Sequence, residues 1–135
     1  MWRKLKRLGV AQLADGLVAL PADARTREAL EWVADEVVEH DGEAMLWLGQ
    51  PADATGLAAI TAKMNAAVAA EYAAVATEAA DIRDGDPATR RRVVARLQRE
   101  LHRIEARDFF ATSERETARR SVEELAASEP TPAKA

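Results

Sequence analysis

The sequence predicts an α+β fold with a small antiparallel sheet near the N-terminus, a long helical hairpin and a C-terminal helix. Three observations carry this prediction. Two apolar runs, 10–13 and 17–20, flank an Asp15-Gly16 pair, which is typical of a β-hairpin because both residues tolerate positive φ. Apolar residues recur at spacings of three and four over two longer segments, 54–82 and 88–107. An Asp-Gly-Asp-Pro break separates these segments and predicts a helix start after it.

The hairpin is framed by two helices and followed by a third apolar run. Residues 2–8 suit a short helix that ends at Gly9, because glycine readily adopts the left-handed conformation of a helix C-terminus. A second helix is predicted over 24–40, with Asp23 as its N-cap. The run Ala-Met-Leu-Trp-Leu over 44–48 then predicts a third strand.

The second half of the chain is helical. The two long apolar segments should pack as an antiparallel hairpin, since each carries an apolar seam. Ser113 and Glu116 have the spacing of a capping box for a last helix over 114–127. We therefore expect one domain over residues 1–127 and a disordered tail over 128–135.

Composition excludes several classes of protein. With 135 residues the chain supports a single domain, and the absence of cysteine excludes disulfides and thiolate chemistry. The formal net charge of −4, with both signs interspersed, demands neither a nucleic acid nor a membrane partner. No stretch reaches the roughly 18 apolar residues of a membrane span. No long apolar region follows the basic N-terminus, so we expect a cytoplasmic protein.

Residues that would carry catalysis or bind a metal are sparse. His40 and His102 are the only imidazoles, and their spacing matches no metal motif. No glycine-rich phosphate loop, nucleophile elbow or grouping of Ser, His and Asp is present. We therefore expect no enzymatic activity, catalytic residue, metal or cofactor.

The aromatic residues suggest structural roles. Trp2, Trp32 and Trp47 lie one each on the first helix, the second helix and the predicted third strand, and we expect them to pack together in the core. Tyr72 places a lone hydroxyl in an apolar helix, which favours a structural role over a catalytic one.

Basic residues form two groups, and both are candidate DNA contacts. On the long helix a stripe beside the apolar seam is formed by residues that recur at spacings of three or four, namely Arg92, Arg96, Arg99, Arg103 and Arg107. Such a stripe fits DNA phosphates, or a small oxyanion such as chromate, or a solvated face whose arginines pair with acids elsewhere. The candidate DNA contacts are Arg3, Lys4, Lys6 and Arg7 in the first group, and Arg91, Arg92, Arg96, Arg99 and Arg103 in the second.

Several motifs occur in the order found in a known family. They are Trp2-Arg3-Lys4-Leu5-Lys6-Arg7-Leu8-Gly9, Asp15-Gly16-Leu17-Val18-Ala19-Leu20-Pro21, Arg27-Glu28-Ala29-Leu30-Glu31-Trp32, Gly42-Glu43-Ala44, Glu71-Tyr72 and Arg107-Asp108-Phe109-Phe110-Ala111. Together they resemble the N-terminal domain of the ChrB family over residues 2–127. The resemblance implies a regulatory or sensing role linked to DNA in bacterial chromate resistance, without a catalytic site in this domain.

The chain departs from that family pattern in one structural respect. Family members usually carry an apolar strand before the Trp-Arg helix, and often a second, C-terminal domain; the sequence shows neither. The element order is then that of a ferredoxin-like remnant missing its first strand, which is central in that fold. An open slot would separate the hairpin from strand 44–48. Three alternatives remain: the start lies earlier, a partner chain fills or covers the slot, or the three strands close up. We favour a homodimer or a repaired edge over a stable monomer. The alternative function is an interaction module that oligomerises through its alanine-rich helices.

Overall fold

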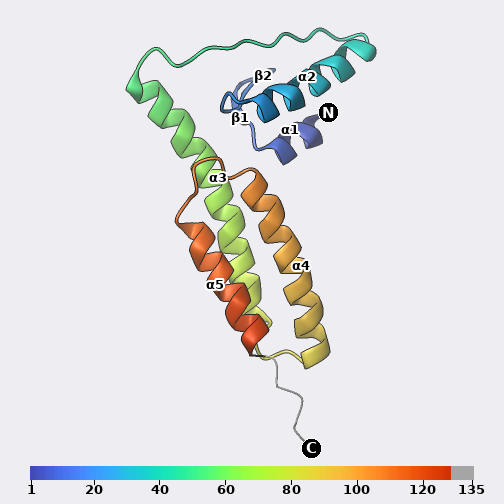
Figure 1. The fold of residues 1–135 in the computed structure, drawn as a ribbon, viewed down its shortest axis with the longest axis vertical. Helices are drawn as coiled ribbons and strands as arrows, with labels where there is room; N and C mark the ends of the chain where they lie inside the picture. Colours follow the sequence, from blue (N-terminus) through green and yellow to red (C-terminus); the bar gives the residue numbers. More distant parts are fainter. Residues whose placement is uncertain (129–135) are drawn as a thin grey trace, which may run out of the picture. The chain divides into compact units, whose positions relative to one another are not determined.

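The computed structural model describes residues 1–128, which contain five helices and one two-stranded antiparallel sheet, so the predicted α+β class is confirmed (Figure 1). The chain divides into two compact units, Met1–Met64 and Asn65–Ala135, hereafter the first and second unit. The predicted tail from residue 129 onward lies outside the described residues. The elements are α1 (Trp2–Leu8), β1 (Ala11–Ala14), β2 (Leu17–Ala19), α2 (Ala24–Glu39), α3 (Ala54–Asp81), α4 (Pro87–Ala106) and α5 (Glu114–Ala127).

Local sequence signals explain the start of the first unit. Helix α1 ends at Gly9, which has a φ of 81° and whose amide closes the last turn onto the carbonyls of Leu5 and Lys6. The hairpin turns at Gly16, whose φ of 75° is costly for any residue with a Cβ. Strands β1 and β2 pair antiparallel with an irregularity between Gln12 and Ala14.

A capping box starts α2 and ties it to the end of the hairpin. As predicted, Asp23 is the N-cap, and its carboxylate accepts the Thr26 amide at 2.8 Å. The Thr26 hydroxyl in turn accepts the Asp23 amide at 3.1 Å and donates to the Pro21 carbonyl at 2.5 Å. Thr26 is buried, so its three polar contacts fix the angle at which α2 leaves β2.

The predicted third strand over 44–48 is wrong. Residues 43–50 have no regular structure and every one of them is exposed, with Met45 at 75% and Trp47 at 82%. A strand needs a neighbour for its N–H and C=O groups, and β1 and β2 pair only with each other. Residues 1–128 hold no strand in the central place of the ferredoxin-like order, so an apolar run alone could not form one.

The expected mutual packing of the tryptophans is also wrong. Trp2 is 42% exposed and Trp32 71% exposed, and Trp47 lies in the exposed segment. On α2 the half-buried residues Leu30 and Val33 share one face, and Trp32 lies on the opposite side of the helix. The buried residues of the first unit are few: Leu5, Ala11, Thr26 and Met64.

The second unit is a three-helix arrangement around one core, as Figure 1 shows for α3, α4 and α5. Ion pairs join Glu71 to Arg107 and Glu78 to Arg96. The later residue of α3 therefore pairs with the earlier arginine, which means that α3 and α4 run in opposite directions. This confirms the predicted antiparallel hairpin. The core consists of Val68, Tyr72, Val75, Ala79, Val94, Leu97, Leu101, Ile104, Ala118, Val122 and Leu125.

The Asp86-Pro87 signal begins α4 as predicted. The Asp86 carboxylate accepts the Thr89 amide at 3.0 Å and the Thr89 hydroxyl at 2.6 Å. These hydrogen bonds, the hydroxyl first, hold the pKa of Asp86 below its ordinary 3.8. Because the pKa is lowered on folding, the stabilisation is complete above the ordinary value and is lost as pH falls through the lower, folded-state value.

Replacing Asp86 with asparagine tests this pH dependence. Asparagine caps a helix nearly as well but cannot ionise. We expect Asp86→Asn to lower the melting temperature at neutral pH, and the difference from wild type to shrink as pH falls below 3.8 and to vanish once pH is below the lowered, folded-state pKa. Thermal unfolding followed by circular dichroism across that range measures it. A difference that stays constant with pH would contradict the assignment.

The predicted capping box at the start of α5 is wrong. Ser113 is the N-cap but has helical φ and ψ of −65° and −27°, and its hydroxyl caps no backbone amide. A side-chain cap needs the extended conformation that points the oxygen back at the first turn. Asp108 instead accepts the Thr112 amide at 3.2 Å, just before the helix.

Candidate functional site

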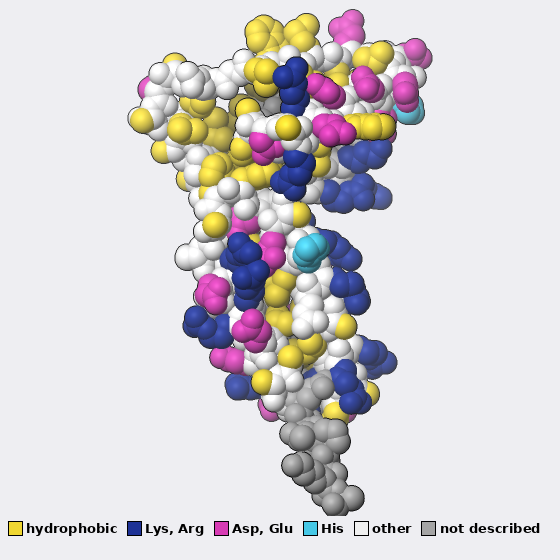
Figure 2. All heavy atoms as spheres, in the orientation of Figure 1, with side chains coloured by type: hydrophobic (Ala, Val, Ile, Leu, Met, Phe, Trp, Pro, Cys, Tyr) yellow, Lys and Arg dark blue, Asp and Glu magenta, His cyan; other side chains and the backbone are white. Residues whose placement is uncertain are grey.

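Helix α4 carries a row of arginines on the side away from its core. The buried row is Val94, Leu97, Leu101 and Ile104. Arg92, Arg96, Arg99 and Arg103 follow at spacings of four, three and four and are all exposed, as the dark-blue side chains along α4 in Figure 2 show. The row extends over about 16 Å of helix axis at about 1.5 Å per residue.

Acids neutralise two members of the row. Arg96 donates two hydrogen bonds to the Glu78 carboxylate of α3, and this pairing raises the pKa of Arg96. Arg103 pairs with Glu100 at 3.1 Å on its own helix. Both pairs are solvent-exposed, so each contributes little to stability but offsets the local positive charge.

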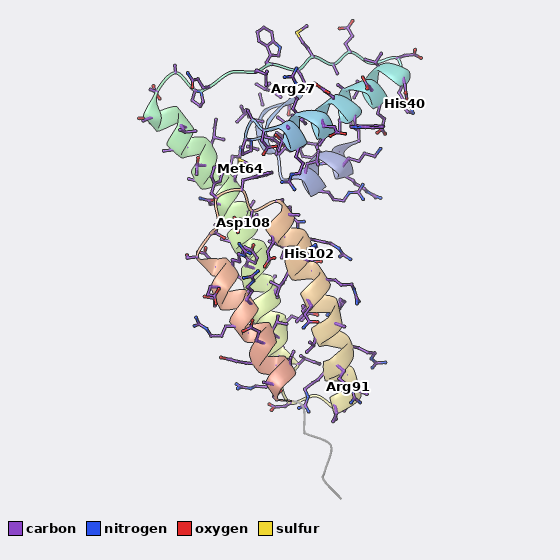
Figure 3. The ribbon with its side chains drawn as sticks, in the orientation of Figure 1. Arg27, His40, Met64, Arg91, His102 and Asp108 are labelled. Atoms are coloured by element: carbon purple, nitrogen blue, oxygen red, sulfur yellow. The ribbon has the colours of Figure 1, made fainter. Side chains whose placement is uncertain are left out.

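Three arginines of α4 remain open to an anionic partner. Arg92 contacts the Thr89 hydroxyl at 3.3 Å and lies within electrostatic reach of the Asp86 carboxylate, but it hydrogen-bonds to no acid among residues 1–128. Arg91, near the start of α4 in Figure 3, and Arg99 are exposed and hydrogen-bond to no acid in the described part of the chain. We name Arg91, Arg92 and Arg99 the open arginine set.

The basic residues of α1 lie in the first unit. Lys4 pairs with Glu36 of α2, and this hydrogen bond lowers the pKa of Glu36. The Lys6 ammonium lies 6.0 Å from the Trp2 ring centroid, at the outer limit of a cation–π contact. Arg3 and Arg7 are exposed and one helical turn apart, with no hydrogen-bonded partner among residues 1–128.

The sequence reasoning missed a buried polar connection in the second unit. Tyr72 of α3 is fully buried, and its hydroxyl donates to the Asp108 carboxylate at 2.9 Å. Asp108, in the turn after α4 (Figure 3), also accepts the hydroxyl of Thr112 at 3.2 Å. Burial, and then the hydrogen bond to Asp108, raise the pKa of Tyr72, so the phenol stays neutral and donates.

An ion pair lies next to this connection in the sequence. Arg107 donates to Glu71 at 2.8 Å, and the Arg107 side chain is only 14% exposed. The motif Glu71-Tyr72 of α3 therefore meets Arg107-Asp108 at the end of α4, residue for residue. The signal in the sequence was this pair of dipeptides, one acidic-aromatic and one basic-acidic, one on each arm of the hairpin.

Neither histidine is placed to hold a metal. Both are exposed, and the His40 ring nitrogen Nδ1 contacts the Glu36 carbonyl at 2.8 Å, at the end of α2. A shallow groove of about 220 Å³ between α4 and α5 includes His102, Glu105 and Arg119 in its lining, a mixed set of charges. Within residues 1–128 no three histidine or carboxylate side chains converge as metal ligands would.

No helix in the described part of the chain combines the length and the hydropathy that crossing a bilayer requires.

The fold and the site define a small, mostly helical α+β protein with an arginine-bearing helix face. The family model "Protein ChrB, N-terminal" matches residues 1–85, well over half of the chain. The chain belongs to the ChrB family and is a ChrB-like, chromate-resistance-associated protein. The match contains α1, the hairpin, α2 and α3, and ends before α4. Neither the curated proteins nor the solved structures contain a significant match to the chain.

Proposed function

We propose that this ChrB-like protein is a regulator that contacts DNA phosphates through the open arginine set of α4. The observation that carries the proposal is the exposure of three arginines on one helix that hydrogen-bond to no acid in the described part of the chain, whose net charge is −4 over its full length. A surface that keeps its positive charge in a protein of negative net charge favours the binding of an anionic partner. In this proposal the domain has no catalytic role, and Arg3 and Arg7 of the first unit are candidate phosphate contacts in their own right.

The spacing of the open arginines supports a polyanion over a small oxyanion such as chromate. Arg92 and Arg99 lie two helical turns apart, which is about 10 Å along the axis. Arg96, between them, is held by Glu78. Side chains spread along a helix in this way match the regular phosphates of a duplex better than one small anion, which needs donors converging on a point.

The test is a titration of labelled duplex DNA from upstream of the gene at several salt concentrations. We expect the double variant Arg92→Ala/Arg99→Ala to weaken binding and to lower the slope of log K against log salt by about two. Arg120→Ala is the control, since it removes an exposed arginine from α5. No binding at low salt, or an equal loss per charge with the control, would remove DNA contact through α4.

A second candidate function is an interaction module that oligomerises through α3. Glu71 and Glu78 are the only charged residues between Asn65 and Ala80. Glu78 pairs with Arg96 of α4, and Glu71 pairs with Arg107 at the C-cap of α4. The opposite side is exposed and uncharged, with Ala66, Ala70, Ala73 and Ala74 on it. Small residues allow helices to approach closely, so this face suits a second helix. Assembly lost in an Ala70→Glu variant, without DNA binding, would favour this candidate.

A further inference from the structure

The segment 44–48 has the apolar side chains of a β-strand, but its backbone pairs with no other strand. Its residues Ala-Met-Leu-Trp-Leu are all exposed, and Figure 2 shows hydrophobic side chains on the surface along this connection, which Figure 1 draws between α2 and α3. The backbone of residues 43–52 makes no backbone hydrogen bond within the described chain. Apolar residues occupy both alternating faces, which is typical of a strand that is covered on both faces.

The hairpin of the same unit offers a free edge. On β1, the Gln12 carbonyl accepts the Lys63 ammonium at 2.6 Å, so a side chain already covers part of that strand. On β2, residues 17–19 hydrogen-bond through their backbone only to β1 among residues 1–128. Leu17 of β2 is 52% exposed. An open, apolar strand edge is a template for pairing with another chain.

We propose that segment 44–48 of one copy pairs as a third strand with the β2 edge of a second copy, and reciprocally, to form a two-fold dimer. Each copy carries both the strand and the edge, which is the condition for a self-complementary interface. This inference stands apart from DNA contact and from the alanine face of α3, because it concerns only the first unit.

Charge and area favour a second copy as the occupant. Neither 44–48 nor the two strands carry a charged residue, so nothing repels the pairing. Trp32, Trp47, Met45, Leu48 and Leu17 are each more than half exposed. Their side chains offer on the order of several hundred Å² per copy, comparable with the roughly 800 Å² that each partner contributes to a stable interface.

The flanking chain gives the segment room to reach a partner. Residues 40–53 contain no helix or strand. Gly42 and Gly49 bracket the segment, and nothing lies within 4 Å of a Cβ built at Gly49. The segment can therefore change its path without breaking a described backbone hydrogen bond of its own.

Hydrogen exchange of the full chain over a hundred-fold concentration range tests the proposal. We expect amides of 45–48 and of 17–19 to become protected together as concentration rises, with sedimentation showing a monomer–dimer equilibrium. Leu46→Pro removes one ladder donor and should abolish both the protection and the dimer. Ala52→Pro, in the same connection but outside the segment, should leave both intact.

Four results would overturn the inference. The chain could stay monomeric throughout, or it could dimerise with new protection only in α3. Protection of 45–48 in a monomer would mean pairing within one chain. A dimer that survives Leu46→Pro with unchanged exchange would place the interface elsewhere. None of these readouts involves DNA, so they leave the proposed DNA contact to its own experiment.

Discussion

Tyr72→Ala is expected to destabilise the second unit by about 3–5 kcal/mol, the cost of removing a buried aromatic ring. Tyr72 is fully buried and belongs to the core that joins α3, α4 and α5. Truncation leaves a cavity among the three helices and removes the hydroxyl that Asp108 accepts. Urea unfolding followed by far-ultraviolet circular dichroism measures the loss, because most of the helix of this unit unfolds with its core.

Tyr72→Phe is the matched control that separates the ring from the hydroxyl. Asp108 keeps its hydrogen bonds from Thr112, so we expect a loss of only about 1–2 kcal/mol. Equal losses for the two variants would show that the hydrogen bond, not the ring, dominates. No loss for either would contradict the role of Tyr72 as the centre of the bundle.

The same hydroxyl has a predictable response to alkali. The pKa of Tyr72 is raised on folding, by burial first and then by Asp108. Its contribution is therefore complete below the ordinary tyrosine pKa of about 10 and is lost as pH rises through the higher folded-state value. Since Tyr72 is the only tyrosine, absorbance of the phenolate should appear only together with loss of helical signal.

Leu97→Ala is expected to cost about 2–5 kcal/mol in the free energy of unfolding. Leu97 is fully buried at the middle of α4, and its side chain contacts the shared core of the three helices. The cost combines lost hydrophobic burial with the cavity that the helices cannot close. Urea unfolding of the variant and of the wild type measures it.

Leu57→Ala provides a control with the same chemical change. Leu57 is 54% exposed near the start of α3, so its truncation should cost less than about 0.5 kcal/mol. A similar loss at both positions would contradict core packing as the cause of the effect. Alanine favours helices at least as well as leucine, so helix propensity predicts no loss at either site.

Local chemistry determined the helices and most of their ends. Asp23 and Asp86 could be identified as N-caps because an aspartate before the first turn accepts a hydrogen bond from a free backbone amide of that turn. Gly9 could be identified as a C-cap because glycine tolerates positive φ. The same reasoning gave a wrong prediction at Ser113, whose side chain caps no backbone amide. Its capping spacing was correct, but its backbone is already helical, and a spacing does not reveal φ and ψ.

For the basic residues, the sequence pattern predicted the helix face but not which arginines pair with acids. Periodicity placed the α4 arginines on one face, and the structure agrees. Which of them stay open depended on acids far along the chain, since Glu78 neutralises Arg96 and Glu71 holds Arg107. Charge alone could not separate these arginines from Arg99, because an ion pair depends on distance in space.

The sequence by itself determined the five helices and the β-hairpin, the pairing of the two long helices and the family, because each depends on short-range patterns and on motifs in a given order. Only the tertiary structure decided that 44–48 is no strand, that Trp32 and Trp47 are exposed, and that Tyr72 meets Asp108. The physical reason is the same in all three. A strand, a buried ring and a buried hydrogen bond each need a partner from elsewhere in the chain. A local apolar pattern does not show which distant segment, if any, is that partner.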